Sequence, residues 1–345
     1  MMKILMFNHG SGFGGAERFI FELSNELEQK GHKVAFCFSD SKNSIFKGKK
    51  TYFINKSGIL PELLELRRII NDFKPDIIHT HNINPFIRGS IIGIIKEIPV
   101  IHTQHGYQKL SFTAGVISNI LALYASGFVF VSNDMMKNSR MLFKENQMRI
   151  NNGIKTEFSE KKKNKTFRIG AIARLEKVKD IMTLIGAFDI LGKNKINAEL
   201  VIIGDGGERR NLESYADSLG LKSVFFKGFM DNSRKHVSSF DLFVSSSLSE
   251  GISISILEAM SCKVPVIATS VGGTPEIIKN NFSGFLIPAK NPEILAEKIE
   301  FVIKNRHSKF IKEMAENARK KVIDYFSIKR AANQYEALYK EVFRL

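Results

Sequence analysis

The sequence DLFVSSSLSEGISISILEAMSCKVPVIATSVGGTPE, residues 241–276, contains two apolar strands, each followed by a turn of small residues and a helical segment. The first strand ends in a serine-rich turn, and Glu250 and Gly251 precede a helix that contains Glu258. The second strand is followed by a Gly-Gly pair before the next helix. This order predicts a parallel α/β sheet, in which ligands bind beyond the carboxyl ends of the strands.

The helix after the serine-rich turn is predicted to begin near Ser253. Its first backbone N–H groups would be free to bind a phosphate group. Glu258 lies more than one turn further along and could accept two hydrogen bonds from a vicinal diol such as a ribose, while Glu250 could reach a second set of hydroxyls. A purely structural interpretation stays open, because Ser255 and Glu258 have the spacing of a capping box.

Two cations follow an earlier strand. In GAIARLEKVKD, residues 170–180, Arg174 comes directly after the strand and Lys179 lies about where the next helix begins. Two fixed cations suit a pyrophosphate, whereas solvated surface charge is the simpler alternative. The stretch GDGGERRNLE, residues 204–213, is another glycine turn at a strand end, suited to close approach of a ligand or simply to a tight turn.

Short apolar runs alternate with amphipathic segments along the whole chain, which is typical of parallel α/β construction. The predicted strands are 3–8, 33–39, 51–55, 76–80, 100–104 and 128–132 in the first half, and 167–173, 198–204, 223–228, 241–246, 264–269 and 284–288 in the second. The charged stretch at residues 160–165 is the predicted linker. We therefore predict two facing, doubly wound Rossmann-like domains with a cleft between them. They cover residues 1–160 and 161–327, and a last helix in residues 328–345 packs back on the first domain.

Composition places the chain among ordinary globular proteins, with 345 residues, 43% hydrophobic and 25% charged. Cys37 and Cys262 lie in apolar runs, as expected of buried thiols in a reducing cytoplasm. The net charge of +16 favours anionic partners. It is spread over both halves with little aromatic-basic interleaving, so no nucleic-acid partner is expected. The apolar run within the first ten residues is too short for a secretory signal. The uncharged stretch 110–133 is better explained by a helix followed by a strand than by a membrane span.

The order and spacing of these residues resemble those of the family 4 glycosyltransferases, retaining enzymes of the GT-B fold. In the second half the matching residues are Arg174, Lys179, Gly204-Asp205-Gly206, Phe226-Lys227-Gly228, Glu250, Gly251, Glu258, Gly272-Gly273, Glu276 and the segment 284–288. In the first half they are Gly14 to Glu17, Lys74 to His79, His102 to His105, Ser132 and Asn152-Gly153. Departures at Asp180, Ser253 and Ser126-Gly127 remove no group expected to contact the donor.

The resemblance implies roles for residues of the second half. Glu258 would hold the ribose hydroxyls of a nucleoside diphosphate sugar, and Glu250 would contact the transferred sugar. Arg174 and Lys179 would neutralise the pyrophosphate and stabilise it as it departs, which is the main catalytic task in such an enzyme.

The resemblance also implies that the backbone around Gly228 faces the base. Gly251, Ile252 and Ser253 would bind the donor at the tip of the helix. His105, in the first half, would meet the donor sugar.

The glycines near the amino end allow two interpretations. Gly10, Gly12 and Gly15 have the spacing of a dinucleotide-binding turn, and Asp40 lies about where a ribose-binding acid would be. The resemblance instead implies that Gly14 and Gly15 let the backbone approach the donor phosphates.

The histidines at predicted strand ends raise the question of a metal. His79 and His81 with His102 and His105 could suggest zinc, but no cysteine accompanies them. The chain contains no Asp-x-Asp sequence, and the family acts without metal. We expect no metal and no cofactor apart from the sugar nucleotide as co-substrate.

The sequence therefore predicts a retaining, metal-independent hexosyltransferase that moves a sugar from a nucleoside diphosphate to a hydroxyl of a glycan or lipid-linked acceptor in cell-surface polysaccharide synthesis. UDP is preferred by its frequency in the family. Peripheral attachment to an anionic inner membrane face through residues 107–123 is a further expectation. The alternatives are a sugar-nucleotide epimerase of the same fold, a nicotinamide enzyme and a non-catalytic sugar-nucleotide binder.

Overall fold

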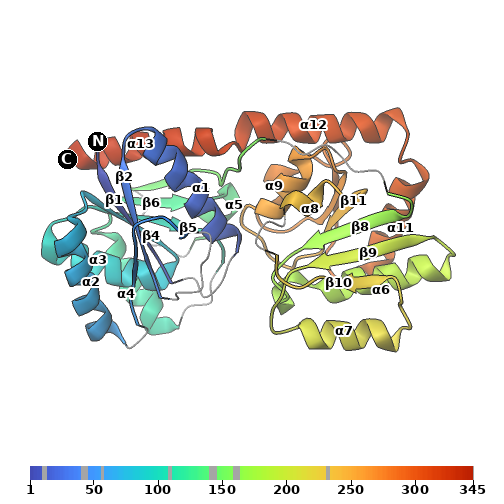
Figure 1. The fold of residues 1–345 in the computed structure, drawn as a ribbon, viewed down its shortest axis with the longest axis horizontal. Coiled ribbons are helices and arrows are strands. Elements are labelled where there is room, and N and C mark those ends of the chain that lie inside the picture. Colours follow the sequence, from blue (N-terminus) through green and yellow to red (C-terminus); the bar gives the residue numbers. More distant parts are fainter. Residues whose placement is uncertain are drawn as a thin grey trace. The chain divides into compact units, whose positions relative to one another are not determined.

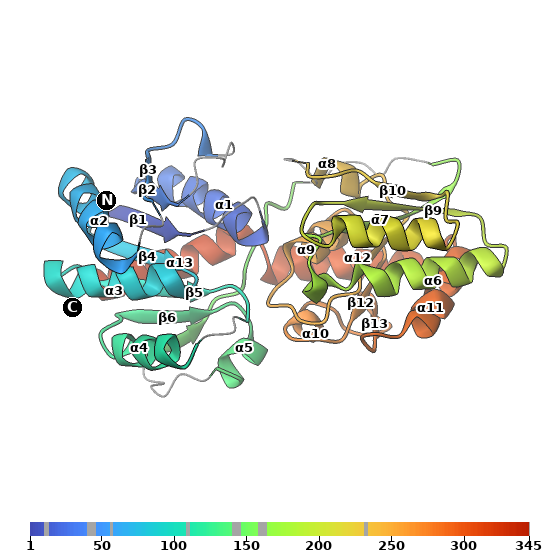
Figure 2. The same cartoon turned by 90° about the horizontal axis from the view of Figure 1, so that it is seen from below.

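The computed structural model describes residues 1–9, 14–39, 46–55, 58–107, 111–139, 146–157, 164–230 and 234–344. The chain divides into two compact units, the first made of Met1–Lys155 and Ile328–Leu345 and the second of Thr156–Ser327. Each unit is a parallel sheet with helices on both faces (Figures 1 and 2). This confirms the predicted fold class of two Rossmann-like parallel-sheet domains.

The first unit contains a parallel sheet with the strand order β3-β2-β1-β4-β5-β6-β7. Its strands are β1 (Lys3–Asn8), β2 (Lys33–Phe38), β3 (Thr51–Phe53), β4 (Ile77–His81), β5 (Val100–Gln104), β6 (Gly127–Phe130) and β7 (Gln147–Arg149). Its helices are α1 (Gly15–Gln29), α2 (Ile59–Phe73), α3 (Ile83–Lys96), α4 (Phe112–Ala122), α5 (Asn133–Lys137) and α13 (Ile328–Arg344). β4 is buried at every position, as expected of a central parallel strand that helices cover on both faces.

The last helix of the chain completes the first unit. α13 packs against α1 (Figure 1), and Ile328 donates its backbone N–H to the carbonyl oxygen of Ile154 at 2.8 Å. Tyr335 and Tyr339 are fully buried. The two rings pack beside His79 of β4, with centroids 5.2 and 5.7 Å from the imidazole. Part of the core of this unit therefore comes from the far end of the sequence.

The second unit contains a parallel sheet with the strand order β10-β9-β8-β11-β12-β13. Its strands are β8 (Phe167–Ile172), β9 (Ala198–Ile203), β10 (Val224–Phe226), β11 (Leu242–Ser245), β12 (Val266–Thr269) and β13 (Phe285–Ile287). Its helices are α6 (Ile181–Lys193), α7 (Arg209–Ser218), α8 (Arg234–Val237), α9 (Ile254–Ser261), α10 (Thr274–Ile277), α11 (Pro292–Lys304) and α12 (Lys309–Tyr325), with the 3₁₀ turn η2 (Lys177–Lys179). α6 packs against α7 and α11, and α9 packs against α8 and α12.

All twelve predicted strands are present, and β7 is an additional one that the sequence did not indicate. β7 is a three-residue edge strand, Gln147–Arg149, with no fully buried position, so no apolar run marks it. The described part of the uncharged stretch, residues 111–133, contains α4 and then β6, as predicted. No helix among the described residues is long and apolar enough to cross a bilayer. Cys37 and Cys262 are buried free thiols, as predicted.

Candidate functional site

The carboxyl ends of β8 and β11 bring two predicted site residues together in the second unit. These strands are neighbours in the sheet, so the turns that follow them lie side by side. The backbone N–H of Leu248 donates to the carbonyl oxygen of Val178 at 2.8 Å, and the Ser246 hydroxyl donates to the carbonyl oxygen of Asp180 at 2.8 Å. The turn that contains Glu250 is thereby fastened to the turn that contains Lys179.

Lys179 and Glu250 form an ion pair at this edge. The Lys179 ammonium donates to Glu250 Oε1 at 2.7 Å, and the side chains are only 24% and 10% exposed. The hydroxyl of Ser247 donates to the same oxygen at 2.7 Å. Charge-assisted hydrogen bonds between partly buried groups are stronger than neutral ones, so this carboxylate has a defined position.

A glycine fixes the backbone on the other side of Glu250. Gly272, in the turn after β12, has φ of +51°, a conformation that L side chains rarely adopt. A Cβ atom there would lie 2.0 Å from the carbonyl oxygen of Glu250. The same oxygen accepts a hydrogen bond from the backbone N–H of Gly273 at 3.1 Å. Glycine is therefore needed at position 272, because the two turns touch there through their backbones.

Arg174 follows β8 in the same loop as Lys179 but has a different partner. Its guanidinium donates to Glu176 at 3.2 Å, and its side chain is about half exposed. The structure thus leaves Arg174 beside the Lys179–Glu250 pair in sequence, without joining it to that pair. An exposed arginine with one surface partner can exchange that partner for an anion at little cost.

Asp180, one of the departures from the family pattern, lies at a special backbone position. It has φ of +45°, in the left-handed region, and it is the N-cap residue of α6. Its carboxylate accepts a hydrogen bond from the Thr183 hydroxyl at 2.8 Å. Aspartate tolerates this conformation better than most residues, which explains how Asp180 can occupy this position.

The helix that carries Glu258 begins where the sequence predicts, but it has no capping box. Ser253 is the N-cap residue of α9, and no side chain caps this end of the helix. Ser255 lies inside the helix and shares a 3.2 Å hydrogen bond with the Ser253 hydroxyl, so the capping-box interpretation of Ser255 and Glu258 is wrong. Glu258 is 2% exposed. Gly251 and Ile252, just before the helix, are buried as well.

Gly228 and two residues that the sequence patterns do not single out complete this edge. Gly228, after β10, has φ of +70°, and its carbonyl oxygen accepts a hydrogen bond from Gly204 N–H at 2.8 Å. A Cβ atom on Gly228 would lie 3.1 Å from Nη1 of Arg209. Arg209 and Ser247 escape prediction because the approach of Arg209 to Gly228, and the sharing of Glu250 by Ser247 and Lys179, exist only in the fold. Asp205, Arg209 and Glu213 are spaced four residues apart, with Arg209 and Glu213 both on α7, and this spacing is the signal that would have pointed to Arg209.

The carboxyl edge of the first unit is organised around a buried glutamate. Gly14 is the N-cap residue of α1 and Gly15 its first residue. The backbone N–H of Gly14 donates to Glu17 Oε2, and Asn8 donates to Glu17 Oε1, both at 3.0 Å. Gly10 and Gly12, as well as Asp40, lie outside the described residues. The carboxylate of Glu17 therefore holds the end of β1 and the start of α1 together.

The histidines of this unit are mainly core residues. His79, His81 and His102 are fully buried. His79 hydrogen-bonds with Tyr339 through Nδ1 at 2.7 Å and with Thr103 through Nε2 at 2.8 Å. Burial lowers the pKa of His79 and His81 well below the usual value and that of His102 to about 4, so all three are neutral at pH 7. Within the described ranges, no group of three potential ligands could hold a metal ion.

His105 lies directly after β5, against a second histidine. Its Nε2 is 3.0 Å from Nδ1 of His81, and the two rings stack with centroids 5.2 Å apart. Burial lowers the pKa of His105 to about 3. A neutral imidazole can hydrogen-bond a hydroxyl group but offers no positive charge to a phosphate.

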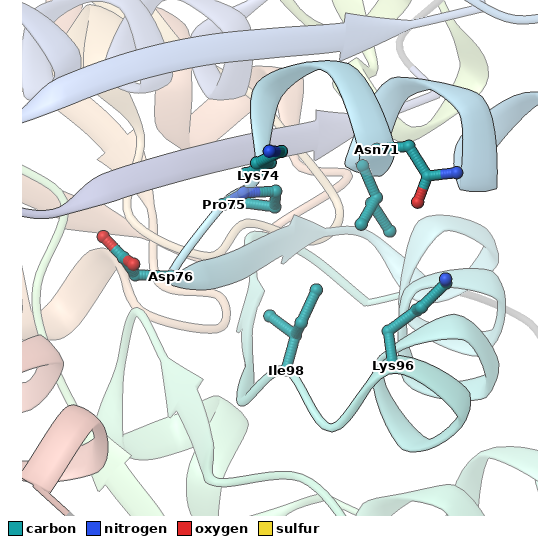
Figure 3. A pocket seen from close by; sticks show the side chains of 7 residues that line it. Asn71, Lys74, Pro75, Asp76, Lys96 and Ile98 are labelled. Atoms are coloured by element: carbon teal, nitrogen blue, oxygen red, sulfur yellow. The ribbon is translucent and has the colours of Figure 1, made fainter.

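A pocket also opens at the opposite edge of the first unit. Figure 3 shows its lining by Ile70, Asn71, Lys74, Pro75, Asp76, Lys96 and Ile98. These residues end α2 and α3 and precede β4 and β5, so the pocket lies at the amino ends of the strands. Ligands of doubly wound sheets bind at the carboxyl ends, and none of the predicted site residues lines this pocket.

Comparison with known protein families matches both halves of the chain. The family model described as Glycosyltransferase Family 4 matches residues 13–158. The model described as Glycosyl transferases group 1 matches residues 154–321. The two matches overlap at residues 154–158 and together cover residues 13–321.

Individual relatives and solved structures extend over nearly the whole chain. N-acetyl-alpha-D-glucosaminyl L-malate synthase of Bacillus anthracis is 24% identical, over 97% of this chain and 94% of its own. UDP-Gal:alpha-D-GlcNAc-diphosphoundecaprenol alpha-1,3-galactosyltransferase of Escherichia coli is 25% identical, over 81% of this chain and 79% of its own. The crystal structure of Anabaena HepE in complex with UDP-glucose superposes with a TM-score of 0.87 at 20% identity and covers 100% of both chains. This structural likeness shows a shared fold.

Proposed function

We propose that this chain, which belongs to the family 4 glycosyltransferases (glycosyl transferases group 1), is a retaining enzyme. It would transfer a sugar from a UDP-sugar to a hydroxyl of a lipid-linked glycan. The coarser statement, that it is a glycosyltransferase, follows from the family matches and the relatives. The donor, the stereochemistry and the acceptor are the proposal. The E. coli relative, whose name specifies a UDP-sugar and a diphosphoundecaprenol acceptor, supports this choice.

The observation that carries the proposal is the Lys179–Glu250 ion pair at the carboxyl edge of the second sheet. A lysine ammonium has three N–H donors, so Lys179 can keep Glu250 and still donate to phosphate oxygens. Glu250, held by Lys179 and Ser247, is then fixed as an acceptor for hydroxyls of the transferred sugar. One pair of side chains thus serves both ends of the bond that breaks.

Departure of the diphosphate is the step that this edge is suited to assist. As the bond between the sugar and the phosphate oxygen breaks, negative charge accumulates on the diphosphate. Lys179, Arg174 and the uncapped amino end of α9 at Ser253 supply positive charge and N–H donors to it. Glu258, buried four residues beyond Ile254 in that helix, is assigned to the ribose hydroxyls. The chemistry proposed needs no metal and no further cofactor.

Donor hydrolysis and acceptor transfer test the proposal directly. The purified chain is incubated with a panel of nucleoside diphosphate sugars, products are followed by mass spectrometry, and glycolipid acceptors are added next. We expect hydrolysis of a UDP-sugar and an α-linked product from an α-linked donor by NMR. Conversion of the donor to its epimer without acceptor would identify an epimerase instead, and an inverted anomeric centre would refute retention.

Attachment to a membrane surface is a second part of the proposal, supported by α4. No charged residue occurs between Ser111 and Tyr124. Phe112 is 86% exposed. The large apolar side chains exposed along this segment are Phe112, Val116, Ile117, Ile120, Leu123 and Tyr124. Contiguous exposed apolar surface marks an interaction site, and the net charge of +16 favours an anionic bilayer as the partner.

Vesicle sedimentation tests this attachment. We expect binding to phosphatidylglycerol vesicles that exceeds binding to phosphatidylcholine vesicles and falls at least about tenfold in the double variant Phe112→Ser/Ile120→Ser, because burial of two large apolar side chains is lost. Ile323→Ser, at an exposed apolar position of α12, is the matched control. Equal binding by the double variant and the control would exclude α4 as the contact.

A further inference from the structure

Arg209 occupies the junction of three turns at the carboxyl edge of the second sheet. It is the first residue of α7, directly after the Gly204–Glu208 turn that follows β9. That turn is hydrogen-bonded to the loop after β8, since Leu175 N–H donates to the carbonyl oxygen of Asp205 at 2.9 Å. On its other side, Nη1 of Arg209 lies 3.1 Å from the position that a Cβ atom of Gly228 would occupy. The guanidinium therefore lies over the backbone of Gly228.

Two carboxylates hold this guanidinium in place. Its Nε donates to Glu213 at 2.8 Å, and its Nη1 donates to Asp205 at 3.1 Å. Asp205 is itself oriented, because its other oxygen accepts the backbone N–H of Gly206 at 2.8 Å. The two pairs use N–H donors in the plane of the guanidinium, so neither carboxylate covers its faces. The side chain of Arg209 is about one-third exposed.

Its surroundings decide which kind of ligand Arg209 suits. Two carboxylates compensate its single positive charge, so it is a poor phosphate ligand compared with Arg174, which has one partner. A flat, weakly hydrated guanidinium with fixed orientation is instead a good stacking surface for an aromatic ring. We propose that Arg209 is a stacking platform for the base of the nucleotide and a residue that sets how strongly the base contributes to binding.

The inference rests on the proposed function, which assigns the diphosphate and the ribose of the nucleotide to this edge, and on the family resemblance, which implies that the backbone around Gly228 faces the base. It adds a residue and a type of interaction to that assignment. Stacking is tolerant of base identity, so the platform predicts that the base strengthens binding, while selection among bases falls to the backbone around Gly228.

Calorimetric binding of UDP and inorganic pyrophosphate to the full chain separates the base from the phosphates. We expect Arg209→Ala and Arg209→Lys each to weaken UDP binding about tenfold, because lysine restores the charge but not the flat surface. Pyrophosphate binding should be unchanged in both. Arg210→Ala, at the exposed neighbouring position of the same helix, is the matched control and should bind both probes as the original chain does.

Three results would overturn the inference. Full UDP affinity in Arg209→Ala would show that Arg209 does not contact the nucleotide. Full UDP affinity in Arg209→Lys would show that only its charge matters. An equal loss of affinity for UDP and for pyrophosphate would show that Arg209 binds the phosphates. A chain that binds no nucleoside diphosphate at all contradicts the proposed function itself. Failure of the inference alone is recognised by normal UDP binding in the original chain and in the variants, with unchanged circular dichroism spectra.

Discussion

The two units share one α/β construction but differ in the chemistry at the carboxyl ends of their strands. In the first unit, the histidines of β4 and β5 are buried, neutral and bonded to hydroxyl groups or to each other. In the second unit, the same edge carries the partly exposed ion pair of Lys179 with Glu250 and the half-exposed guanidinium of Arg174. The topology places the loops at one edge of each sheet. The residues on those loops then determine which charge a ligand bound there can carry. An anionic ligand is therefore expected at the second edge.

The largest expected difference between the units is their response to acid. The pKa values of His102 and His105 are lowered by burial to about 4 and about 3, and those of His79 and His81 are lowered as well. Below the unfolded pKa of about 6.5, these histidines are protonated in the unfolded chain but remain neutral in the folded unit. The free energy of unfolding is therefore highest above that pH and falls as the pH decreases towards 4. Each histidine that is protonated only in the unfolded chain contributes a slope of about 1.4 kcal/mol per pH unit.

Hydrogen exchange with mass spectrometry measures this response unit by unit. Between pH 6.5 and 4, peptides from β4 and β5 should lose protection before those from β8 and β9, after correction for the intrinsic pH dependence of exchange. Simultaneous loss in both units would mean that the buried histidines do not distinguish them.

The next largest effect is expected at the carboxyl edge of the second sheet. Arg174→Ala and Glu258→Ala should each reduce sugar transfer at least about tenfold, the loss expected for one charge-assisted contact. Steady-state kinetics with the donor identified by the hydrolysis screen measures the change. Wild-type rates in both variants would show that these two assignments are wrong, however similar the fold is to that of the relatives.

A smaller effect is expected at the carboxyl edge of the first sheet. Tyr339→Phe removes the hydroxyl that bonds Nδ1 of His79 and leaves a buried ring nitrogen without that partner. The free energy of unfolding of the first unit should fall by about 1 to 2 kcal/mol. Urea denaturation measures it, with Tyr325→Phe at an exposed position of α12 as the control. An unchanged midpoint would mean that the hydrogen bond adds nothing to the packing of the ring.

The smallest effect is expected for an ion pair of the second unit that lies away from the edge. Arg168 on β8 pairs with Glu199 on β9 at 3.2 Å, with both side chains about one-third exposed. Arg168→Ala should leave sugar transfer unchanged and cost less than about 1 kcal/mol in unfolding free energy. A loss of transfer comparable to that of Arg174→Ala would show that general positive charge, not position at the edge, explains the effect.

Much of the fold was predictable because apolar runs mark buried parallel strands. The strands from β1 to β6 and from β8 to β13 could all be recognised in this way, whereas β7 is a half-polar edge strand that leaves no such mark. The C-terminal helix was also recognised from its periodicity, but its buried bonds to His79 and Thr103 were not, since they join residues more than two hundred positions apart.

Most residues of the candidate site could be predicted from the sequence, but the contacts between them could not. Family spacing singled out Lys179 and Glu250 separately, but the ion pair between them depends on β8 and β11 being neighbours in the sheet. The capping-box interpretation failed because local spacing cannot tell whether Ser253 or Ser255 is the residue that precedes the helix. Arg209 was missed because its relation to Gly228 exists only once β9 and β10 have paired.

The origin of α13 has a consequence for how the protein is made. The first unit needs Tyr335 and Tyr339 to close its core, yet the ribosome delivers these residues only after the entire second unit has been synthesised. The amino-terminal unit can therefore complete its core only after residues 156–327 have been synthesised. Nascent chains that lack residues 328–345 should therefore expose the incomplete amino-terminal unit to chaperones and proteases.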